Sequence, residues 1–281
     1  MKYLIVKGYL GFGDRLESLK MCVKYALEKN RAIYIDWRDS VWSHSDESFY
    51  KYFDLKMPSI DIDCLPPNLS VYPECWKSIL KEPYKDEYAT LPDINIGSLT
   101  KDYEEDIVVY SCIGYRLIFP SSNFFTNIFR VIHPEIKQEV LKRVSTYDLK
   151  NKICIHLRGT DRLQNLSKLQ RFRGVRLRMI EKGLFKGEGF IALTDDEDFA
   201  RMWNANFNYP LLTKIFVSNS IGNHLVKKEN LAVTKDTLNK DMLIDFFTMA
   251  FCKDILSSSK DSRFAAESRR LHPWITDIFS N

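Results

Sequence analysis

The sequence predicts an α/β protein with doubly wound sheets in two domains. Short apolar runs of strand type alternate with stretches of helical period from Tyr3 onward. A second series of the same kind begins after Asn151. The chain of 281 residues fits two modest domains at roughly 150 residues each. These three observations place a boundary near residue 150, with domains at 1–150 and 151–281.

The first forty residues predict a β-loop-α-β unit. Tyr3 to Val6 is a strand-like apolar run, and a glycine-bearing loop follows from Gly8 to Asp14. Residues 16–27 carry apolar side chains three and four positions apart, and residues 32–37 read as a second strand. Such a unit gives parallel strands joined by a right-handed crossover.

The middle of the chain is less informative. Residues 38–100 show little periodicity, so a loop-rich region with short helices is expected there and no element is placed. A strand is predicted at residues 107–112. Pro134 opens an amphipathic helix, because proline suits the first helical position.

The second domain repeats the alternation. Strands are predicted at 153–157, 190–193, 212–217 and 255–257, and helices at 164–182, 197–204, 240–252 and 262–271. In open parallel sheets, ligands bind beyond the carboxyl ends of the strands. The loops that follow the strands are therefore the candidate functional segments.

Composition excludes several classes of protein. The 41 basic and 37 acidic side chains leave a net charge of +4, too little for a whole-molecule field toward nucleic acid or an anionic membrane. The longest uncharged runs, 107–115 and 117–129, are shorter than the roughly 20 apolar residues of a membrane-spanning helix. Six scattered cysteines without zinc-ligand spacing predict reduced, mostly buried thiols. With no signal-peptide core at the amino terminus, a cytoplasmic location is expected.

Three loops carry candidate chemistry. The first, Gly11-Phe12-Gly13-Asp14-Arg15, lets the backbone approach a ligand at the start of a helix, although a glycine pair in a turn is also common without a ligand. It lacks the third glycine of a dinucleotide fingerprint, since Leu16 stands there, and it has no P-loop lysine.

The second loop, His156-Leu157-Arg158-Gly159-Thr160-Asp161-Arg162, holds charged groups at a strand end, where they are costly in a core and useful in a pocket. The third runs from Ser257 to Arg263. Its hydroxyl and N–H groups suit an anion, but serine and aspartate are also ordinary helix caps.

Together these segments resemble the GDP-fucose-dependent α1,6-fucosyltransferases, closest to the rhizobial nodulation enzymes that act on chitin oligosaccharides. The opening residues 11–19 and 32–38 are similar to the first β-α-β unit of those enzymes, and His156 to Arg162 is similar to the His-x-Arg-x-Thr-Asp-Lys/Arg peptide of the family. Residues 193–196, 217–220 and 258–263 look like the nucleotide-side and serine-rich loops, whereas residues 40–105 show almost no likeness.

The resemblance implies a GT-B fold, in which two Rossmann-like domains face a cleft, with the acceptor side in 1–150 and the nucleotide sugar in 151–281. It implies transfer of fucose from GDP-fucose, or a related sugar nucleotide, to a glycan acceptor with inversion and without a metal or other cofactor. Arg158 would grip the β-phosphate and Asp161 would position that loop. The remaining substrate-binding residues would be Gly11, Gly13, Asp14, Arg15, His156, Asp195, Asp196, Ser258, Ser259, Ser262 and Arg263. His156 and Asp196 would read the guanine and its ribose.

Some features depart from the family. Leu166 stands where the animal enzymes have a catalytic glutamate, so the acceptor base is open among Glu17, Asp14 and Asp39. A basic run, Lys168, Arg171, Arg173, Arg176 and Arg178, is either a solvated helix face or a contact to a phosphorylated or acidic acceptor.

Two rival functions stay open. Asp196-Glu197-Asp198 fits the Asp-x-Asp pattern of metal-dependent glycosyltransferases that use another sugar nucleotide. The basic run from Arg162 to Arg178 would suit an RNA- or anion-binding module, although nucleic acid is not the expected partner.

Overall fold

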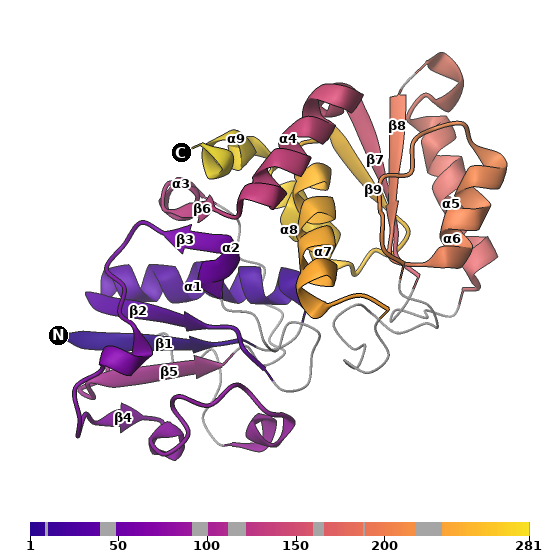
Figure 1. Ribbon diagram of the computed structural model, residues 1–281. Helices are drawn as coiled ribbons and strands as arrows, with labels where there is room; N and C mark the ends of the chain where they lie inside the picture. Colours follow the sequence, from indigo (N-terminus) through magenta and orange to yellow (C-terminus); the bar gives the residue numbers. More distant parts are fainter. Residues whose placement is uncertain are drawn as a thin grey trace. The chain divides into compact units, whose positions relative to one another are not determined.

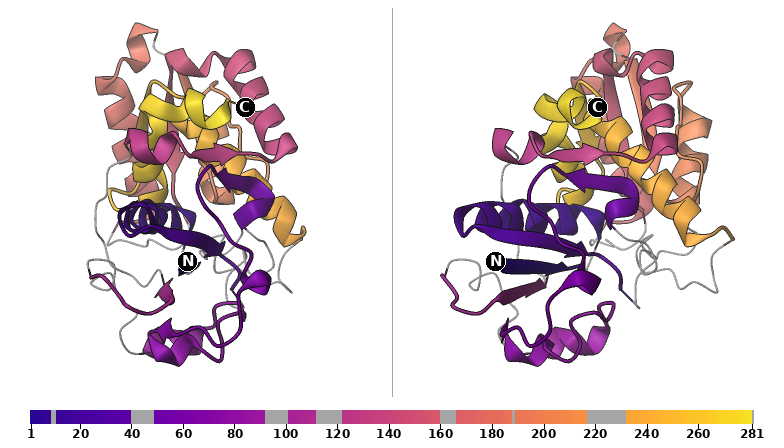
Figure 2. Two further views of the ribbon diagram at one scale, coloured as in Figure 1. Left: turned by 90° about the vertical axis from the view of Figure 1, so that its left-hand side faces the viewer. Right: turned by 60° about the vertical axis from the view of Figure 1, so that its left-hand side comes forward.

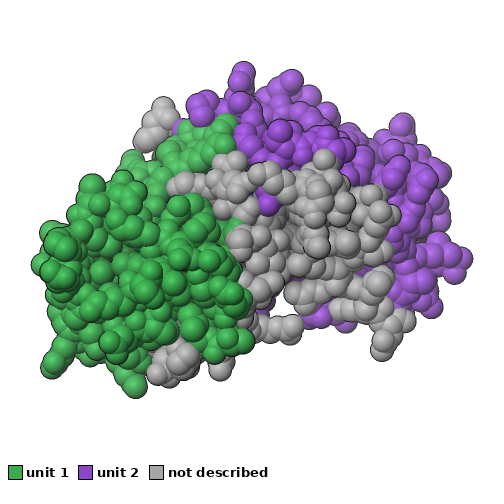
Figure 3. Space-filling view, turned by 60° about the horizontal axis from the view of Figure 1, so that its bottom comes forward, with its two compact units in different colours: residues 1–133, 276–281 green, residues 134–275 purple. Residues whose placement is uncertain are grey.

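The computed structural model describes residues 1–8, 11–39, 49–91, 101–111, 122–159, 166–187, 189–216 and 232–280. The chain forms two compact units, one of residues 1–133 and 276–281, the other of residues 134–275 (Figure 3). Helix α4 (Pro134–Tyr147) is in the second unit because it packs against α7 (Lys235–Ala250). The division thus falls somewhat before residue 150.

The first unit contains a parallel sheet in the order β2-β1-β5-β4. Its strands are β1 (Lys2–Lys7), β2 (Arg31–Asp36), β4 (Val71–Tyr72) and β5 (Ile107–Ser111). Helix α1 (Phe12–Glu28) connects β1 to β2 and runs along one face of the sheet (Figures 1 and 2). The predicted β-loop-α-β unit is present, with the parallel pairing expected for it.

The region without sequence periodicity supplies a large part of this unit's core. Trp76, Tyr84 and Tyr88 are buried against apolar side chains of β1, β2 and β5. The short elements of this unit are α2 (Phe49–Tyr52) and β3 (Phe53–Leu55) within that region, and α3 (Asn123–Thr126) and β6 (Phe129–Val131) beyond it, with β3 and β6 paired antiparallel. The final helix is α9 (Ile275–Phe279). Aromatic burial replaces regular periodicity in this segment.

The second unit is a three-stranded parallel sheet between two layers of helices. Its strands are β7 (Lys152–Leu157), β8 (Gly189–Thr194) and β9 (Asp254–Ser257), in the order β8-β7-β9. Helices α5 (Lys168–Glu181) and α6 (Glu197–Asn206) cover one face, and α4, α7 and α8 (Arg263–Leu271) lie on the other (Figure 1). Strand β7 is central and pairs with β8 and β9.

The strand predicted at 212–217 is wrong over its described residues. Residues 212–216 form no strand, and a single parallel bridge links Leu211 to Ala192 of β8. Side chains of neighbouring helices take the backbone groups that a strand would use. Arg143 donates to the Leu212 carbonyl at 2.8 Å, and the Ile215 N–H donates to Asp241 at 3.0 Å.

Candidate functional site

The carboxyl ends of β7, β8 and β9 bring three sequence-distant loops to one edge of the sheet. The parallel register places His156 of β7 opposite Leu193 of β8 and Ser257 of β9. The residues that follow, Arg158, Asp195 and Ser258, therefore meet beyond the same edge. We refer to these three loops as the strand-end site.

Arg158 is held from its backbone as well as its side chain. Its N–H donates to the Ser258 hydroxyl at 2.8 Å, and its carbonyl accepts from Arg171 at 2.8 Å. Its guanidinium Nη1 lies 3.5 Å from Asp195 Oδ2. Since the Arg158 side chain keeps 16% of its surface exposed, the forked cation is positioned and still reachable by solvent.

Gly159 is required by a close approach of two loops. Its N–H donates to Asp195 at 3.1 Å, and a Cβ at this position would lie 2.2 Å from the Cβ of Asp196. Asp196 has little freedom to move, because it caps α6 by accepting from the Phe199 N–H at 3.0 Å. The space between the β7 and β8 loops thus admits only glycine.

The serine loop after β9 contains an unsatisfied buried hydroxyl. Ser259 is 2% exposed, and its Oγ has no hydrogen-bond partner among the described residues. Buried polar groups are nearly always paired, so this hydroxyl is available to a ligand. Ser257, which the sequence reasoning did not select, holds the loop. Its Oγ is 3.1 Å from Nδ1 of His156 and accepts from the Ser259 N–H at 3.3 Å.

His156 and the helix cap lie behind this loop. His156 is 4% exposed, and its ring packs at a tilt of 32° against the ring of Phe264 of α8, with the ring centroids 5.7 Å apart. Ser262 caps α8 by accepting from the Ala265 N–H at 3.3 Å, as the cap alternative predicted, and Arg263 begins the helix half-buried. These side chains stabilise the end of β9 and the start of α8.

Helix α5 supports the site with basic residues that the sequence left unassigned. The helix begins at a capping box formed by Ser167 and Gln170. Arg171, buried over the ring of Phe199, supports Arg158, and burial lowers the pKa of its guanidinium. Arg178 donates to the Ser257 carbonyl at 2.7 Å. The helical period is the signal that could have found them, because it places both arginines on the side of the apolar residues Phe172, Val175 and Met179.

Lys168 lies between the two aspartates of the Asp-x-Asp pattern. Its Nζ is 2.6 Å from Asp196 and 2.8 Å from Asp198. Burial alone would lower the pKa of Lys168, but the hydrogen bonds that its ammonium donates to both carboxylates, and their charges, outweigh burial and raise the pKa. Among the described residues, no group of three His, Cys, Asp or Glu side chains is placed to hold a metal ion. An ammonium thus occupies the position that a cation would take between these carboxylates.

Two buried aspartates, Asp241 and Asp245, lie near the end of β8, and Asp245 is hydrogen-bonded in a network that supports this strand end. Asp245 accepts from Arg143 at 2.8 Å and from Thr213 at 2.5 Å, and Thr213 in turn accepts from the Thr194 N–H at 3.0 Å. Burial, together with the charge of Asp245, raises the pKa of Asp241 to about 7. This network fixes the strand end that carries Asp195 and Asp196.

The first unit carries its own strand-end residues. Gly11 precedes α1, and Gly13, Asp14 and Arg15 lie in its first turn. Arg15 is buried, donates to the Trp37 carbonyl at 2.5 Å and forms an ion pair with Asp39, so it ties α1 to the end of β2.

A buried lysine, missed in the sequence, reinforces this edge of the first unit. Lys7 of β1 pairs with Asp36 of β2 at 2.7 Å and also donates to the carbonyls of Leu80 and Glu82. Burial lowers the pKa of Lys7 despite the attraction of Asp36. Lys7 thus links the sheet to residues 80–82, in the segment where the sequence predicted no element.

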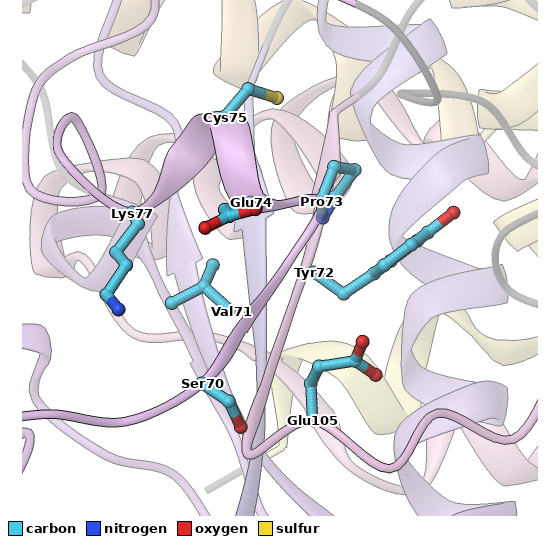
Figure 4. A pocket seen from close by; sticks show the side chains of 8 residues that line it. All are labelled: Ser70, Val71, Tyr72, Pro73, Glu74, Cys75, Lys77 and Glu105. Atoms are coloured by element: carbon cyan, nitrogen blue, oxygen red, sulfur yellow. The ribbon is translucent and has the colours of Figure 1, made fainter.

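A cavity of about 540 Å³ lies elsewhere in the first unit, beside the amino end of β5 (Figure 4). Tyr72 in its wall stacks on Tyr103, with ring centroids 4.2 Å apart. The whole lining is Ser70, Val71, Tyr72, Pro73, Glu74, Cys75, Lys77 and Glu105. The cavity is thus at the opposite end of the sheet from Gly11 and Arg15.

Some predicted site residues lie outside the described part of the chain. These are Asp161, which was expected to be catalytic, its neighbours Thr160 and Arg162, and residues 217–220. Within the described ranges, no helix is long and apolar enough to cross a bilayer.

Comparison with known proteins decides the fold. No family model matches the sequence, and no curated protein matches it. Among solved structures, an α1,6-fucosyltransferase, NodZ, soaked with GDP-fucose, matches with a TM-score of 0.68 at 20% identity, covering 97% of this chain and 94% of that one. A fucosyltransferase NodZ structure from Bradyrhizobium gives 0.67 at 18% identity over 96% and 92%. This chain has a fucosyltransferase fold.

More distant fucosyltransferases share the fold. FUT1 of Arabidopsis thaliana, in complex with GDP, has a TM-score of 0.56 at 14% identity, covering 97% of this chain and 68% of that chain. POFUT1 in its apo form gives 0.55 at 12% identity over 97% and 95%. The α/β GT-B fold class predicted from the sequence is confirmed.

Proposed function

We propose that this chain is a glycosyltransferase that moves fucose, or a related sugar, from a GDP-sugar to a glycan acceptor. The observation that carries the proposal is the strand-end site of the second unit. There a partly exposed guanidinium and an unsatisfied serine hydroxyl stand beyond three parallel strands, in a fold shared with structures that were soaked or crystallised with GDP-fucose or GDP.

Arg158 is the proposed catalytic cation. As the sugar leaves, negative charge develops on the diphosphate, and a fixed guanidinium with nearby N–H and O–H donors stabilises that charge. Asp195 holds Arg158 at 3.5 Å, and a diphosphate would compete with this carboxylate for the same cation. Ser258 and Ser259 are the proposed donors of the phosphate cradle. Asp161 keeps its proposed role of positioning the loop.

We assign His156 and Asp196 to holding the loops around the nucleotide. The resemblance suggested direct contact with guanine and ribose, but both side chains are almost fully buried and already hydrogen-bonded to Ser257 and Phe199. Their substitution should therefore weaken GDP binding through loop position. The metal-independent part of the proposed inverting mechanism is supported by Lys168, whose ammonium neutralises Asp196 and Asp198.

The acceptor side is proposed to lie in the first unit, with Asp14 as the base. Glu17 and Asp39 were the other candidates, but both are buried and Asp39 is paired with Arg15. Asp14 is half-buried in the first turn of α1 and is the most accessible of the three. An Asp14→Asn variant should bind GDP normally and lose transfer activity.

A nucleotide thermal-shift screen tests the donor assignment. A ligand at about 100 times its Kd adds about 2.7 kcal/mol to the stability of the native state. GDP should raise the melting temperature, whereas UDP and CMP should not. Unchanged GDP protection in EDTA supports the metal-free mechanism, and its loss would favour the Asp-x-Asp alternative.

Two arginine substitutions, one in the strand-end site and one outside it, test the role of Arg158. Arg158→Ala should lower kcat/KM by about 10²–10³, while Arg173→Ala, a substitution on the exposed side of α5, should leave it unchanged. Full activity in Arg158→Ala, or equal losses in the two variants, would contradict the role assigned to Arg158.

A further inference from the structure

Helix α5 has an exposed apolar stripe in addition to the face that packs on the sheet. Leu169, Leu177 and Ile180 are 50%, 62% and 38% exposed. Phe185, in the turn that follows the helix, is 79% exposed. The spacings from 169 to 177 and 180 keep the helical members on one side. Large apolar side chains are normally exposed singly, so a stripe of this kind indicates an interaction surface.

Two arginines lie on the same stripe. Arg173 and Arg176 follow Leu169 at four and seven positions and are both exposed. Neither has an ion pair or a hydrogen bond within the described ranges. The helix has one acidic residue, Glu181, at its last position. The stripe therefore combines apolar side chains with uncompensated positive charge.

The other basic residues of α5 are already engaged. Lys168 pairs with Asp196, Arg171 donates to the Arg158 carbonyl, and Arg178 donates to the Ser257 carbonyl. The basic run thus divides into an inward group that supports the strand-end site and an outward pair, Arg173 and Arg176, that has no partner among the residues that the structure describes. The strand-end site therefore gives no role to Arg173 and Arg176.

The combination of apolar and basic side chains in the stripe favours a lipid surface over a second copy of the chain or an RNA. A second copy docked by two-fold symmetry on this stripe would bring like charges together, since each copy would present the same surface. An RNA would use the arginines and stack a base on Phe185, but it would gain little from the aliphatic side chains of Leu169, Leu177 and Ile180, which make up most of the apolar stripe. Anionic lipid headgroups satisfy the arginines while the apolar side chains enter the boundary of the acyl region.

We propose that the exposed stripe of α5, formed by Leu169, Arg173, Arg176, Leu177 and Ile180, docks the protein on an anionic membrane surface together with Phe185 of the turn that follows the helix. The attachment is peripheral and reversible, with Phe185 and Leu177 as the inserting side chains and the two arginines at the headgroup level. The proposal does not depend on the transferase function, because it uses residues that face away from the strand-end site.

Vesicle co-sedimentation of the full chain tests this. Vesicles of phosphatidylcholine with 30% phosphatidylglycerol should bind the protein, and phosphatidylcholine alone should bind it weakly. Near an anionic surface each arginine contributes a factor of roughly five in partitioning, so Arg173→Glu/Arg176→Glu should reduce binding about thirtyfold or more. Leu177→Ser/Phe185→Ser should also reduce binding, and more salt should weaken it.

A matched charge-reversal variant outside the stripe distinguishes binding through the stripe from binding through the overall charge of the protein. Lys142→Glu/Lys150→Glu changes two exposed basic residues of the same unit and alters the net charge equally. It should bind vesicles nearly as the natural sequence does. Circular dichroism and the melting temperature measured without ligand should show that all three double variants stay folded.

Several results would overturn the lipid assignment. One is the absence of binding to the anionic vesicles by a folded protein. Another is an equal loss of binding in the Lys142/Lys150 variant. Lipid-free self-association that Leu177→Ser/Phe185→Ser abolishes in sedimentation equilibrium would assign the stripe to a second copy. Tight binding to a 20-nucleotide RNA with no vesicle binding would assign it to nucleic acid.

Discussion

The substitution Gly159→Ala should disrupt the contact between the β7 and β8 loops. The added methyl group would lie 2.2 Å from the Cβ of Asp196 and 2.4 Å from its Cγ, where carbon atoms normally approach to about 3.5–4.0 Å. One of the two loops must therefore move by more than an ångström. Asp196 resists the move, because it caps α6 and pairs with Lys168.

The expected cost follows from these contacts. Overpacking of a tight site costs about 1–3 kcal/mol, and loss of the Asp196 cap costs about 1 kcal/mol more. We expect Gly159→Ala to lower the free energy of unfolding by about 2–4 kcal/mol. The moved loop also carries Arg158, so the affinity for GDP should fall as well.

Gly174 is the matched control within the same unit. It lies inside α5, and a Cβ there meets nothing within 4 Å. Gly174→Ala should stabilise the protein by about 0.5–1 kcal/mol, because alanine restricts the unfolded chain and favours the helix. Urea titrations followed by circular dichroism, with GDP binding by calorimetry, would measure both variants against the natural sequence.

A double-mutant cycle identifies the cause. Asp196→Gly keeps an acceptable cap residue and removes the atoms that the new methyl group would meet. In that background Gly159→Ala should cost less than about 1 kcal/mol. If it costs as much as in the natural sequence, or if Gly159→Ala alone is as stable as Gly174→Ala, the steric argument fails.

Three further predictions concern the pH dependence of stability, the support of Arg158 by Arg171, and the reactivity of the cysteines. Because burial raises the pKa of Asp241 to about 7 in the folded chain, the folded state holds an extra proton up to about pH 7, and stability falls as pH rises through that range. Between urea titrations at pH 5 and 8, Asp241→Asn should reduce the fall by up to about 3 kcal/mol, which corresponds to roughly two pH units at about 1.4 kcal/mol each. Arg171→Met keeps the packing over Phe199 but loses the donor to the Arg158 carbonyl, so GDP affinity should fall about tenfold by calorimetry with a smaller effect on stability; unchanged affinity would refute the supporting role. Burial raises the pKa of Cys154, so thiol labelling mapped by mass spectrometry should modify the exposed Cys64 in the native protein and Cys154 only after unfolding.

The sequence predicted the parallel core well, because its strands and helices have strong periodicity. Strands β1, β2, β7 and β8 and helices α1, α4 and α6 lie close to their predicted ranges. Helix α7 begins earlier than expected, since Thr234 caps it by accepting from the Thr237 N–H. The aromatic core around Trp76 and Tyr84 was invisible, because short irregular segments bury large rings without a regular period.

The candidate site was predicted at the level of loops, but the roles within it required coordinates. The principle that ligands bind beyond the carboxyl ends of parallel strands directed attention to Arg158, Asp195 and Ser259. It could not show that a cap fixes Asp196 in place, or that the Ser259 hydroxyl is left without a partner. Hydrogen bonds between residues far apart in sequence decide such roles, and periodicity carries no information about them.

The basic run of α5 shows how one helix can serve two purposes. Positions 171 and 178 are seven apart and face the strand ends, whereas 173 and 176 lie on the stripe that begins at Leu169. In the sequence these four arginines form one cluster, and only their directions separate them. The two proposed roles predict opposite phenotypes. Arg171→Met should weaken GDP binding and leave vesicle binding intact, whereas Arg173→Glu/Arg176→Glu should do the reverse. If the two properties were lost together in both variants, the division of the helix into inward and outward arginines would be wrong.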